Sequence, residues 1–221
     1  MRMTAPAPSV TIGQLMLADE PARWQALGFA VSDATLHLGS VRVALAGKDA
    51  GRGILGWALR NATSVELDGL PTSLSDTPAS QQEAQPHSNG VVAIDHVVAM
   101  SSDLDRSVLA MQAAGLDLRR IREQPTPAGA PRQAFFRLGE VILELVQEPD
   151  EVLAARTNGG EHPAHFWGLA LLSDDLERTV QRLDEHVSEI RPAVQPGRRI
   201  VTLRRSAGLA VPVALMSRAE D

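Results

Sequence analysis

The sequence predicts an α+β protein made of repeated units, each with one strand, one helix and three further strands. Two segments, SSDLDRSV at 101–108 and SDDLERTV at 173–180, match closely, and each lies between an apolar run and a helical pattern. The runs HLGSVRVALAG at 37–47 and RLGEVILELVQ at 137–147 also share Leu, Gly, Val and Leu at equal spacing. This internal similarity indicates that one supersecondary unit recurs along the chain.

The clearest unit begins with GVVAIDHVVAM at 90–100, an apolar run that reads as a strand. Ser102 or Asp103 can cap the helix that follows by accepting backbone N–H bonds, and Gly115 is a plausible end for it. Three strand-like runs separated by turn residues complete the unit: LDLRRIREQ, RQAFFRLG and EVILELVQ.

The same order is expected in the last part of the chain. An apolar run that contains Trp167 is followed by a helical pattern at 175–187 and by the strand-like runs EIRPAVQ, RRIVTLRR and LAVPVALMS. By its position in the alternation we expect Trp167 to lie in the core.

The N-terminal part carries a degenerate copy. TIGQLML is its first strand, and QALGF at 25–29 parallels QAAGL at 112–116 near the end of a short helix. The segment GILGWALRNATSVELDGL at 53–70 has two interpretations: a fourth copy that stops after its first strand and a stub of helix, or an added edge strand.

These patterns predict three parts. We expect a degenerate unit with an extra strand at 1–70, a flexible linker rich in Pro, Ser, Gln and Ala at 71–90, and a domain of two units at 91–217.

Composition narrows the class of protein. The chain has 221 residues, 44% of them hydrophobic, a net charge of −6 and no cysteine. Acidic and basic residues are interleaved, so no basic face for nucleic acid is expected, and disulfides and thiol catalysis are ruled out. The N-terminal segment MRMTAPAPSVTIGQL has no apolar core of signal-peptide length, and no run in the chain approaches a membrane span. We expect a cytoplasmic protein with neither nucleic acid nor membrane among its partners.

IDHVVAMSSDLDRSV together with LGEVILELV resembles the vicinal oxygen chelate superfamily. This group includes glyoxalase I, extradiol dioxygenases, methylmalonyl-CoA epimerase and the fosfomycin and bleomycin resistance proteins. The resemblance covers about 91–217 and, more loosely, 10–70. It implies that two units lie side by side and curve a mostly antiparallel sheet around a cleft, with the helices outside. Such a fold does not by itself define an activity.

The resemblance also implies where a metal would bind. In metal-dependent relatives the ligands come from the first and last strands of both paired units, and His96 and Glu144 fall on those positions of the first unit. The match between 101 and 173 carries His96 onto Gly168, and the closing-strand match carries Glu144 onto Ala214; neither residue has a ligating side chain.

Gln14 aligns with His96 in the N-terminal copy. It completes three ligands for Zn, Fe, Mn or Ni only if that copy pairs with the first unit. The alternative is a metal-free His96–Glu144 pair that anchors a ligand or acts as acid and base.

Alternation along the strands predicts which other side chains face the cleft. The expected ligand-binding residues are Val98, Met100, Ile142, Gly168, Ala170, Ala214 and Arg199. The small residues leave space for a largely apolar molecule, or they let the sheets close with no pocket. The arginine binds a carboxylate or phosphate, or it belongs to a solvated strand edge. Either Phe135 or Phe136 faces the cleft.

Three functions remain open at this level. The first is a metal-free binder of a small, largely apolar organic molecule. The second is a metal-dependent lyase, isomerase or dioxygenase that uses His96 and Glu144. The third is a non-catalytic interaction module whose cleft is filled by the N-terminal copy. Open sheet edges also suggest a homodimer.

Overall fold

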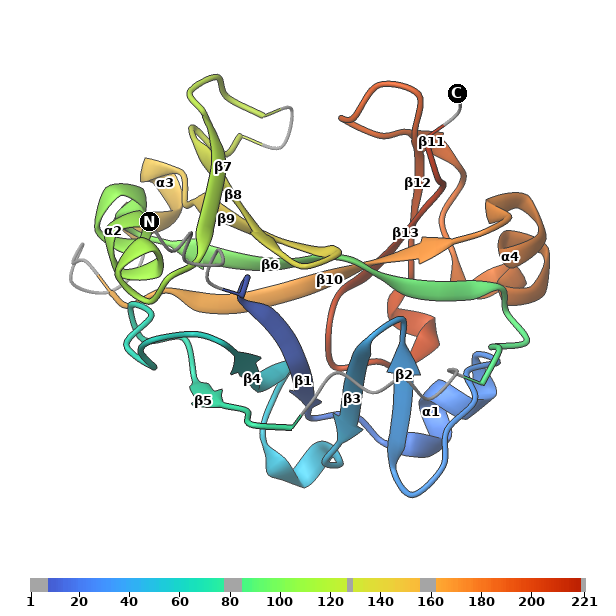
Figure 1. Cartoon of the computed structure of the whole chain (residues 1–221). Helices are drawn as coiled ribbons and strands as arrows, with labels where there is room; N and C mark the ends of the chain where they lie inside the picture. Colours follow the sequence, from blue (N-terminus) through green and yellow to red (C-terminus); the bar gives the residue numbers. More distant parts are fainter. Residues whose placement is uncertain (1–7, 78–84, 127–128, 156–161, 220–221) are drawn as a thin grey trace, which may run out of the picture.

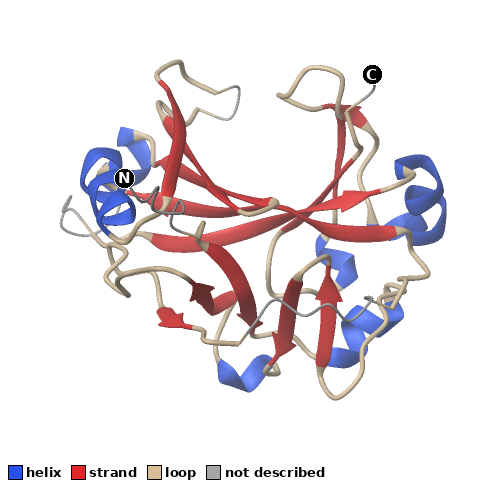
Figure 2. Ribbon diagram, viewed as in Figure 1, coloured by secondary structure: helices blue, strands red, loops and turns tan. Residues whose placement is uncertain are grey.

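The computed structural model describes residues 8–77, 85–126, 129–155 and 162–219, which form two sheets with helices at their flanks (Figures 1 and 2). Sheet A has the strand order β2-β3-β1-β4-β5, and sheet B has the order β11-β12-β13-β10-β6-β9-β8-β7. The predicted α+β class, with a curved, mostly antiparallel sheet and outer helices, is confirmed.

The elements of the N-terminal part are β1 (Thr11–Leu17), α1 (Pro21–Ala26), β2 (Thr35–Leu38), β3 (Val41–Leu45), the short 3-10 helix η1 (Lys48–Ala50), β4 (Ile54–Arg60) and β5 (Thr72–Leu74). The first paired unit consists of β6 (Val91–Ser101), α2 (Leu104–Ala113), β7 (Asp117–Arg122), β8 (Gln133–Leu138) and β9 (Val141–Gln147), and α3 (Asp150–Ala155) follows it. The second paired unit consists of β10 (His165–Ser173), α4 (Leu176–Leu183), η2 (Asp184–His186), β11 (Arg191–Pro192), β12 (Arg199–Thr202), η3 (Arg205–Ala207) and β13 (Val213–Met216).

The repeated Ser-x-Asp-Leu motif, at 101–104 and 173–176, caps both long helices. The Asp103 carboxylate accepts the backbone N–H of Arg106 at 3.0 Å, and Asp175 accepts that of Arg178 at the same distance. These bonds satisfy amide groups that a helix N-terminus leaves without partners. Gly115, with φ of +87°, lies just beyond α2, where the backbone takes the left-handed conformation that suits glycine.

The two paired units join through their first strands. β6 and β10 run antiparallel in the middle of sheet B, and each has its own closing strand, β9 or β13, parallel on its other side. Val97 and Leu143 are fully buried on the face toward the core, so His96 and Glu144 lie on the opposite, concave face. In Figure 1 the outer strands rise on both sides of that face and make sheet B a U.

Sheet A repeats this arrangement in reduced form. β1 and β4 run antiparallel, and their parallel neighbours are β3 and β5. The N–H of Trp57 donates to the carbonyl of Pro71 at 3.1 Å, and in sheet B the N–H of Leu169 donates to that of Pro212 at 2.9 Å. β4 and β5 thus occupy the positions in sheet A that β10 and β13 hold in sheet B, as a fourth copy at 53–70 would require, and β5 lies inside the expected 71–90 linker.

A single hydrophobic core joins the sheets, since the buried side chains of both form one continuous cluster. Trp57 of β4 meets Phe166 of β10 edge to face, with ring centroids 5.0 Å apart. Trp167, expected in the core, is 53% exposed because a bulge interrupts the β6–β10 register between Phe166 and Gly168. Within the described ranges, no helix is both long and apolar enough to cross a membrane.

Candidate functional site

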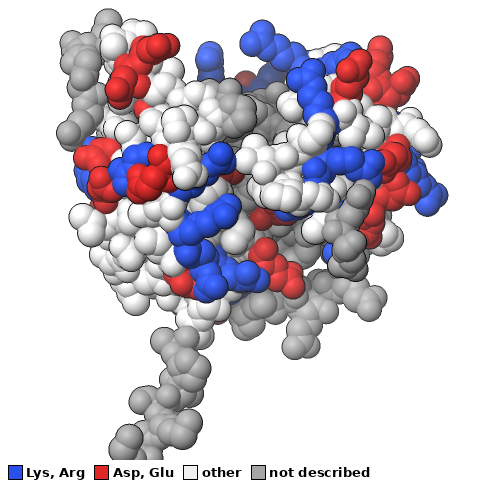
Figure 3. Space-filling model, turned by 90° about the horizontal axis from the view of Figure 1, so that it is seen from above, with Lys and Arg blue, Asp and Glu red and all other residues white. Residues whose placement is uncertain are grey.

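The concave face of sheet B holds two adjoining cavities of about 660 and 340 Å³. They share five lining residues: His96, Arg120, Phe135, Glu144 and Gln195. Seen from above, basic and acidic side chains are interspersed over this side of the molecule (Figure 3). The candidate site is therefore one cleft with two lobes and with His96 and Glu144 where the lobes meet.

A bulge in β6 brings Asp95 beside His96. His96 pairs with Ala170 and Ile94 pairs with Leu171, so Asp95 is an extra residue with no partner across the strands. Its Oδ2 lies 2.8 Å from His96 Nδ1. A carboxylate only accepts, so this bond places a proton on Nδ1 and leaves Nε2 facing the cleft.

Arg198 holds the outer side of Asp95. Its Nη2 donates to Asp95 Oδ1 at 2.6 Å, and its Nε donates to the Ser217 carbonyl. Burial alone would raise the pKa of the Asp95 carboxyl, but the hydrogen bonds from His96 and Arg198 outweigh it and hold the pKa below its ordinary value. Asp95 is thus a fixed anion that orients the His96 ring.

Glu144 completes the pair from β9. Its Oε2 lies 3.3 Å from His96 Nε2, and its Oε1 accepts a hydrogen bond from the Gln133 side-chain amide. The Glu144 side chain is only 15% exposed. Burial raises the pKa of Glu144 above its ordinary value, and the charge of His96 offsets only part of that effect. Either Nε2 or the carboxyl can carry the proton between them, which makes the pair a possible proton donor and acceptor.

The other predicted cleft residues divide into two groups. Ile142 lines the smaller lobe. Val98 and Met100 instead pack into a small apolar cluster with Val146 and Ala130. They lie on the concave face but do not line either lobe.

The three small residues pack between strands. A Cβ added at Gly168 would lie 2.7 Å from the Pro212 carbonyl oxygen, so this glycine admits the chain leading into β13. Ala170 is 2% exposed and lies between His96 and Ala214 in the sheet. None of the three lines either lobe of the cleft.

The prediction for Arg199 had the wrong parity. Its guanidinium forms an ion pair with Glu177 of α4, on the outer side of the sheet. The neighbouring Arg198 points into the cleft instead, as does Ile200 two positions on. The predicted alternation along this strand was correct, but nothing in it showed whether the face with Arg198 or the face with Arg199 was turned toward the cleft.

The structure does not bring Gln14 to His96. Gln14 lies on β1 in sheet A, where its side-chain oxygen accepts a hydrogen bond from Arg42 at 2.5 Å, and it lines a separate cavity of about 330 Å³. Since the first unit pairs with the second, the three-ligand set that required Gln14 is excluded. The described residues contain no group of three or more His, Asp or Glu side chains placed to hold a metal.

Some cleft residues were not anticipated. Arg120 and Arg122 come from β7, Gln133 from β8, and Asp95 from the bulge. Phe135, one of two candidates for the cleft wall, lines both lobes, whereas Phe136 is fully buried. The alternation of Arg120 and Arg122 in LDLRRIREQ was a usable signal, because residues two apart on a strand share a face.

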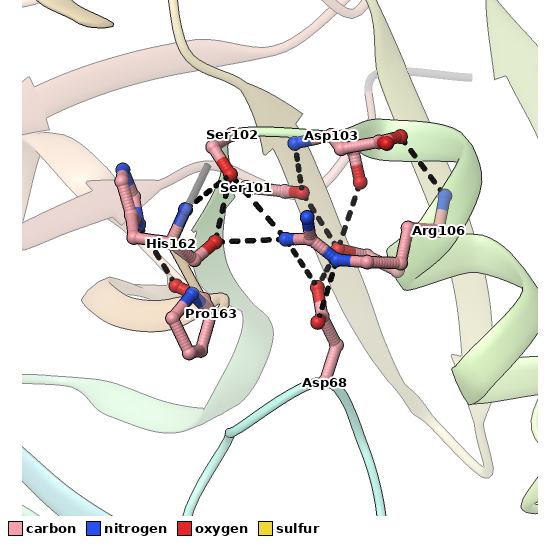
Figure 4. Close-up of polar contacts among 8 residues, drawn as sticks. Asp68, Ser101, Ser102, Asp103, Arg106, His162 and Pro163 are labelled. Carbon is pink, nitrogen blue, oxygen red and sulfur yellow. Dashed lines mark hydrogen bonds and ion pairs between the residues drawn. The ribbon is translucent and has the colours of Figure 1, made fainter. Parts of the chain in front are cut away.

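A second polar cluster lies at the C-terminal end of β6 and joins the N-terminal part to the first unit (Figure 4). The Asp68 carboxylate accepts from Arg106 Nε at 2.9 Å and from the Ser107 hydroxyl. Arg106 also donates to the carbonyl of His162 at 2.7 Å, and His162 Nε2 lies 2.6 Å from the buried Glu148 carboxylate. Because these side chains bond to one another across three segments of the chain, we interpret the cluster as a structural contact between the two parts and call it the joint.

The fold and cleft define a class: proteins in which paired strand–helix–three-strand units enclose a cleft on one concave sheet. The model for the Glyoxalase/Bleomycin resistance protein/Dioxygenase superfamily matches residues 93–209, and the chain belongs to that superfamily. None of the curated proteins compared matches the chain.

Solved structures agree in fold. The chain is similar to a xylose isomerase-like TIM barrel/4-hydroxyphenylpyruvate dioxygenase fusion protein, with a TM-score of 0.63 and 16% identity over 98% of this chain and 50% of that one. It is also similar to methylmalonyl-CoA epimerase from Mycobacterium tuberculosis, with a TM-score of 0.49 and 18% identity over 62% of this chain and 94% of that one. The first of these similarities includes the N-terminal part, and at 16% identity it describes the fold alone.

Proposed function

We propose that the protein binds a small organic molecule in the sheet B cleft without a complete metal site, and that the His96–Glu144 pair exchanges a proton with it. The observation that carries this proposal is the 3.3 Å contact between His96 Nε2 and Glu144 Oε2 at the junction of the two lobes. A largely buried acid–base pair that opens on a cavity is what general acid–base chemistry needs.

The roles of the neighbouring residues follow from their contacts. Asp95, fixed by Arg198, keeps the His96 proton on Nδ1, so that Nε2 remains the exchanging atom. Gln133 donates to one oxygen of Glu144 and leaves the other directed at His96. A ligand that displaces the His96–Glu144 contact meets an acceptor and a donor in one place.

A metal-dependent lyase, isomerase or dioxygenase is less well supported. Structural and catalytic metal sites generally take three or four protein ligands. His96 and Glu144 supply two. Ala170, which pairs with His96, and the matching positions of the second unit, Gly168 and Ala214, supply none. We therefore derive no step through a metal.

The interaction-module alternative requires the N-terminal part to fill the cleft. The described residues that line both lobes all come from 95–216, and sheet A packs on the other face of sheet B. Nothing in the described part of the chain therefore blocks a small ligand. The proposed homodimer remains a prediction, for which light scattering on the eluted protein is the direct measurement.

The test is a fragment screen by thermal shift, with binding constants for the hits measured on wild type, His96→Asn, Glu144→Gln and Gln14→Ala. A ligand that binds only the native state raises the melting temperature. We expect His96→Asn and Glu144→Gln to weaken binding, and Gln14→Ala, which alters the separate sheet A cavity, to leave it unchanged. Hits whose binding constants are the same in wild type, His96→Asn and Glu144→Gln would refute the proposed site.

Metal content is measured on wild type, His96→Ala and Glu144→Ala after loading with Fe, Mn, Zn or Ni and desalting. Near-stoichiometric metal in wild type that is absent from His96→Ala and Glu144→Ala would overturn the metal-free mode and favour the metal-dependent alternative.

A further inference from the structure

One wall of the larger lobe carries two arginines, Arg120 and Arg122, that form no ion pair with any described residue, although both act on the Glu144 carboxyl from a distance. Arg120 and Arg122 lie on β7, opposite Phe135 and Gln133 of β8, and both line the 660 Å³ lobe. Neither forms an ion pair or a side-chain hydrogen bond with any residue that the structure describes, apart from the contact of Arg120 with an aromatic ring. Other arginines nearby are paired: Arg119 with Asp117 at 3.1 Å and Arg198 with Asp95 at 2.6 Å.

The charge of this lobe is opposite to that of the chain. Glu144 is the one acidic residue among the described residues that line it, and burial favours the neutral form of that carboxyl by raising its pKa. Two permanent guanidinium charges therefore face the lobe of a protein whose net charge is −6. A cavity with low-dielectric walls strengthens such a field toward a small anion.

Arg120 is held in a geometry suited to binding an oxyanion. Its guanidinium carbon lies 4.6 Å from the centroid of the Phe135 ring. Stacking on a ring occupies the face of the guanidinium and leaves its N–H groups at the edge free to bind two oxygens at once. The Phe135 ring also restricts the movement of the Arg120 guanidinium on one side.

The wall opposite is mainly apolar. It consists of the segment from Pro192 to Pro196, with Ile200 and Met216 beneath it. The lobe thus combines cations on the β7 side with a surface that suits hydrocarbon or aromatic groups on the other.

We propose that Arg120 and Arg122 bind the oxyanion, a carboxylate or a phosphate, of an organic anion whose apolar part lies between Phe135 and the Pro192–Pro196 segment. This inference rests on the proposed function, because the same ligand then reaches His96 and Glu144. It replaces the largely apolar molecule expected from the sequence with an amphiphilic anion.

The experiment compares benzoate, benzamide and phenyl phosphate as probes on the full chain. Benzamide has nearly the shape of benzoate but no charge. Binding constants come from titrations followed by ¹H–¹⁵N NMR at low salt, because salt screens such contacts. The variants are Arg120→Gln/Arg122→Gln and the control Arg23→Gln/Arg52→Gln, which removes the same charge from exposed positions of the N-terminal part.

In wild type and in the control we expect benzoate to bind at least about tenfold more tightly than benzamide, since hydrogen bonds to charged groups are the stronger kind. In Arg120→Gln/Arg122→Gln that preference should disappear while the weak binding of benzamide stays. Tighter binding of phenyl phosphate than of benzoate identifies phosphate as the group recognised, and the reverse identifies carboxylate.

Two results would overturn the inference. One is equal binding of benzoate and benzamide to wild type, and the other is a preference for benzoate that survives in Arg120→Gln/Arg122→Gln. If benzamide and benzoate bind equally but His96→Asn still weakens both, the proposed function stands and only the anion inference fails. If none of the three probes shifts any cleft resonance, the anion inference fails, and the fragment screen decides the proposed function.

Discussion

Replacing Phe135 or Phe136 by alanine tests which face of β8 forms the cleft. Phe136 is fully buried and pairs with Leu143 on the core side of the sheet. Phe136→Ala therefore removes a ring and leaves a cavity, at a cost of about 3–5 kcal/mol in the free energy of unfolding. Phe135 borders a cavity that already exists, so Phe135→Ala loses partial burial and the contact with Arg120, about 1–2 kcal/mol.

The two substitutions are at adjacent positions and remove the same atoms from the side chain, so each variant is a control for the other. For a chain of this size 1 kcal/mol shifts the melting temperature by about 2–4 °C, so roughly 6–20 °C is expected for Phe136→Ala and roughly 2–8 °C for Phe135→Ala. Urea denaturation followed by tryptophan fluorescence measures the same difference. Equal or reversed effects would refute the register of β8 and with it the assignment of Arg120 and Gln133 to the cleft.

Three further predictions concern Glu144, the paired glycines and the joint between the two parts of the chain. Burial raises the folded-state pKa of Glu144 above its ordinary value of 4.5, so the folded protein holds that proton more tightly than the unfolded chain and loses stability as the pH rises through the folded-state pKa. Glu144→Gln should therefore gain stability relative to wild type between pH 4 and 7, as urea denaturation across that range would show; a constant difference would contradict the shift. Gly168→Ala and Gly56→Ala should each lower stability by about 1–3 kcal/mol, because the new Cβ would lie 2.7 and 2.8 Å from a proline carbonyl oxygen, and unchanged melting temperatures would exclude that close packing. Asp68→Asn should cost about 1–3 kcal/mol by weakening the contact with the partly exposed Arg106, and an unaltered urea midpoint would show that the joint contributes nothing.

The sequence predicted the fold well because the helix caps and the closing strands of the repeated units could be recognised in it. Asp103 and Asp175 cap helices as expected, and the inward and outward positions of β6 and β9 follow the predicted alternation. The linker at 71–90 stays a prediction, since 78–84 lie outside the described residues, but β5 occupies part of it. Thr72–Leu74 is too short and too polar to stand out as a strand, and it forms one only because β4 offers a free edge.

The site was predicted less completely, because it depends on which units pair and on local irregularities. His96 and Glu144 do lie together. Asp95 reaches His96 through a bulge, and simple alternation would have placed it on the other face. Arg198 rather than Arg199 faces the cleft for a similar reason: the absolute phase of an alternating strand is set by packing that the strand's own residues do not reveal.

The two paired units contribute unequally to the cleft. His96, Glu144, Gln133 and the β7 arginines all belong to the first unit, whereas the second supplies mostly apolar surface, with Arg198 as an anchor for Asp95. Substitutions that alter the Pro192–Pro196 segment can thus change the size and shape of the molecule accommodated without touching the groups that would react with it.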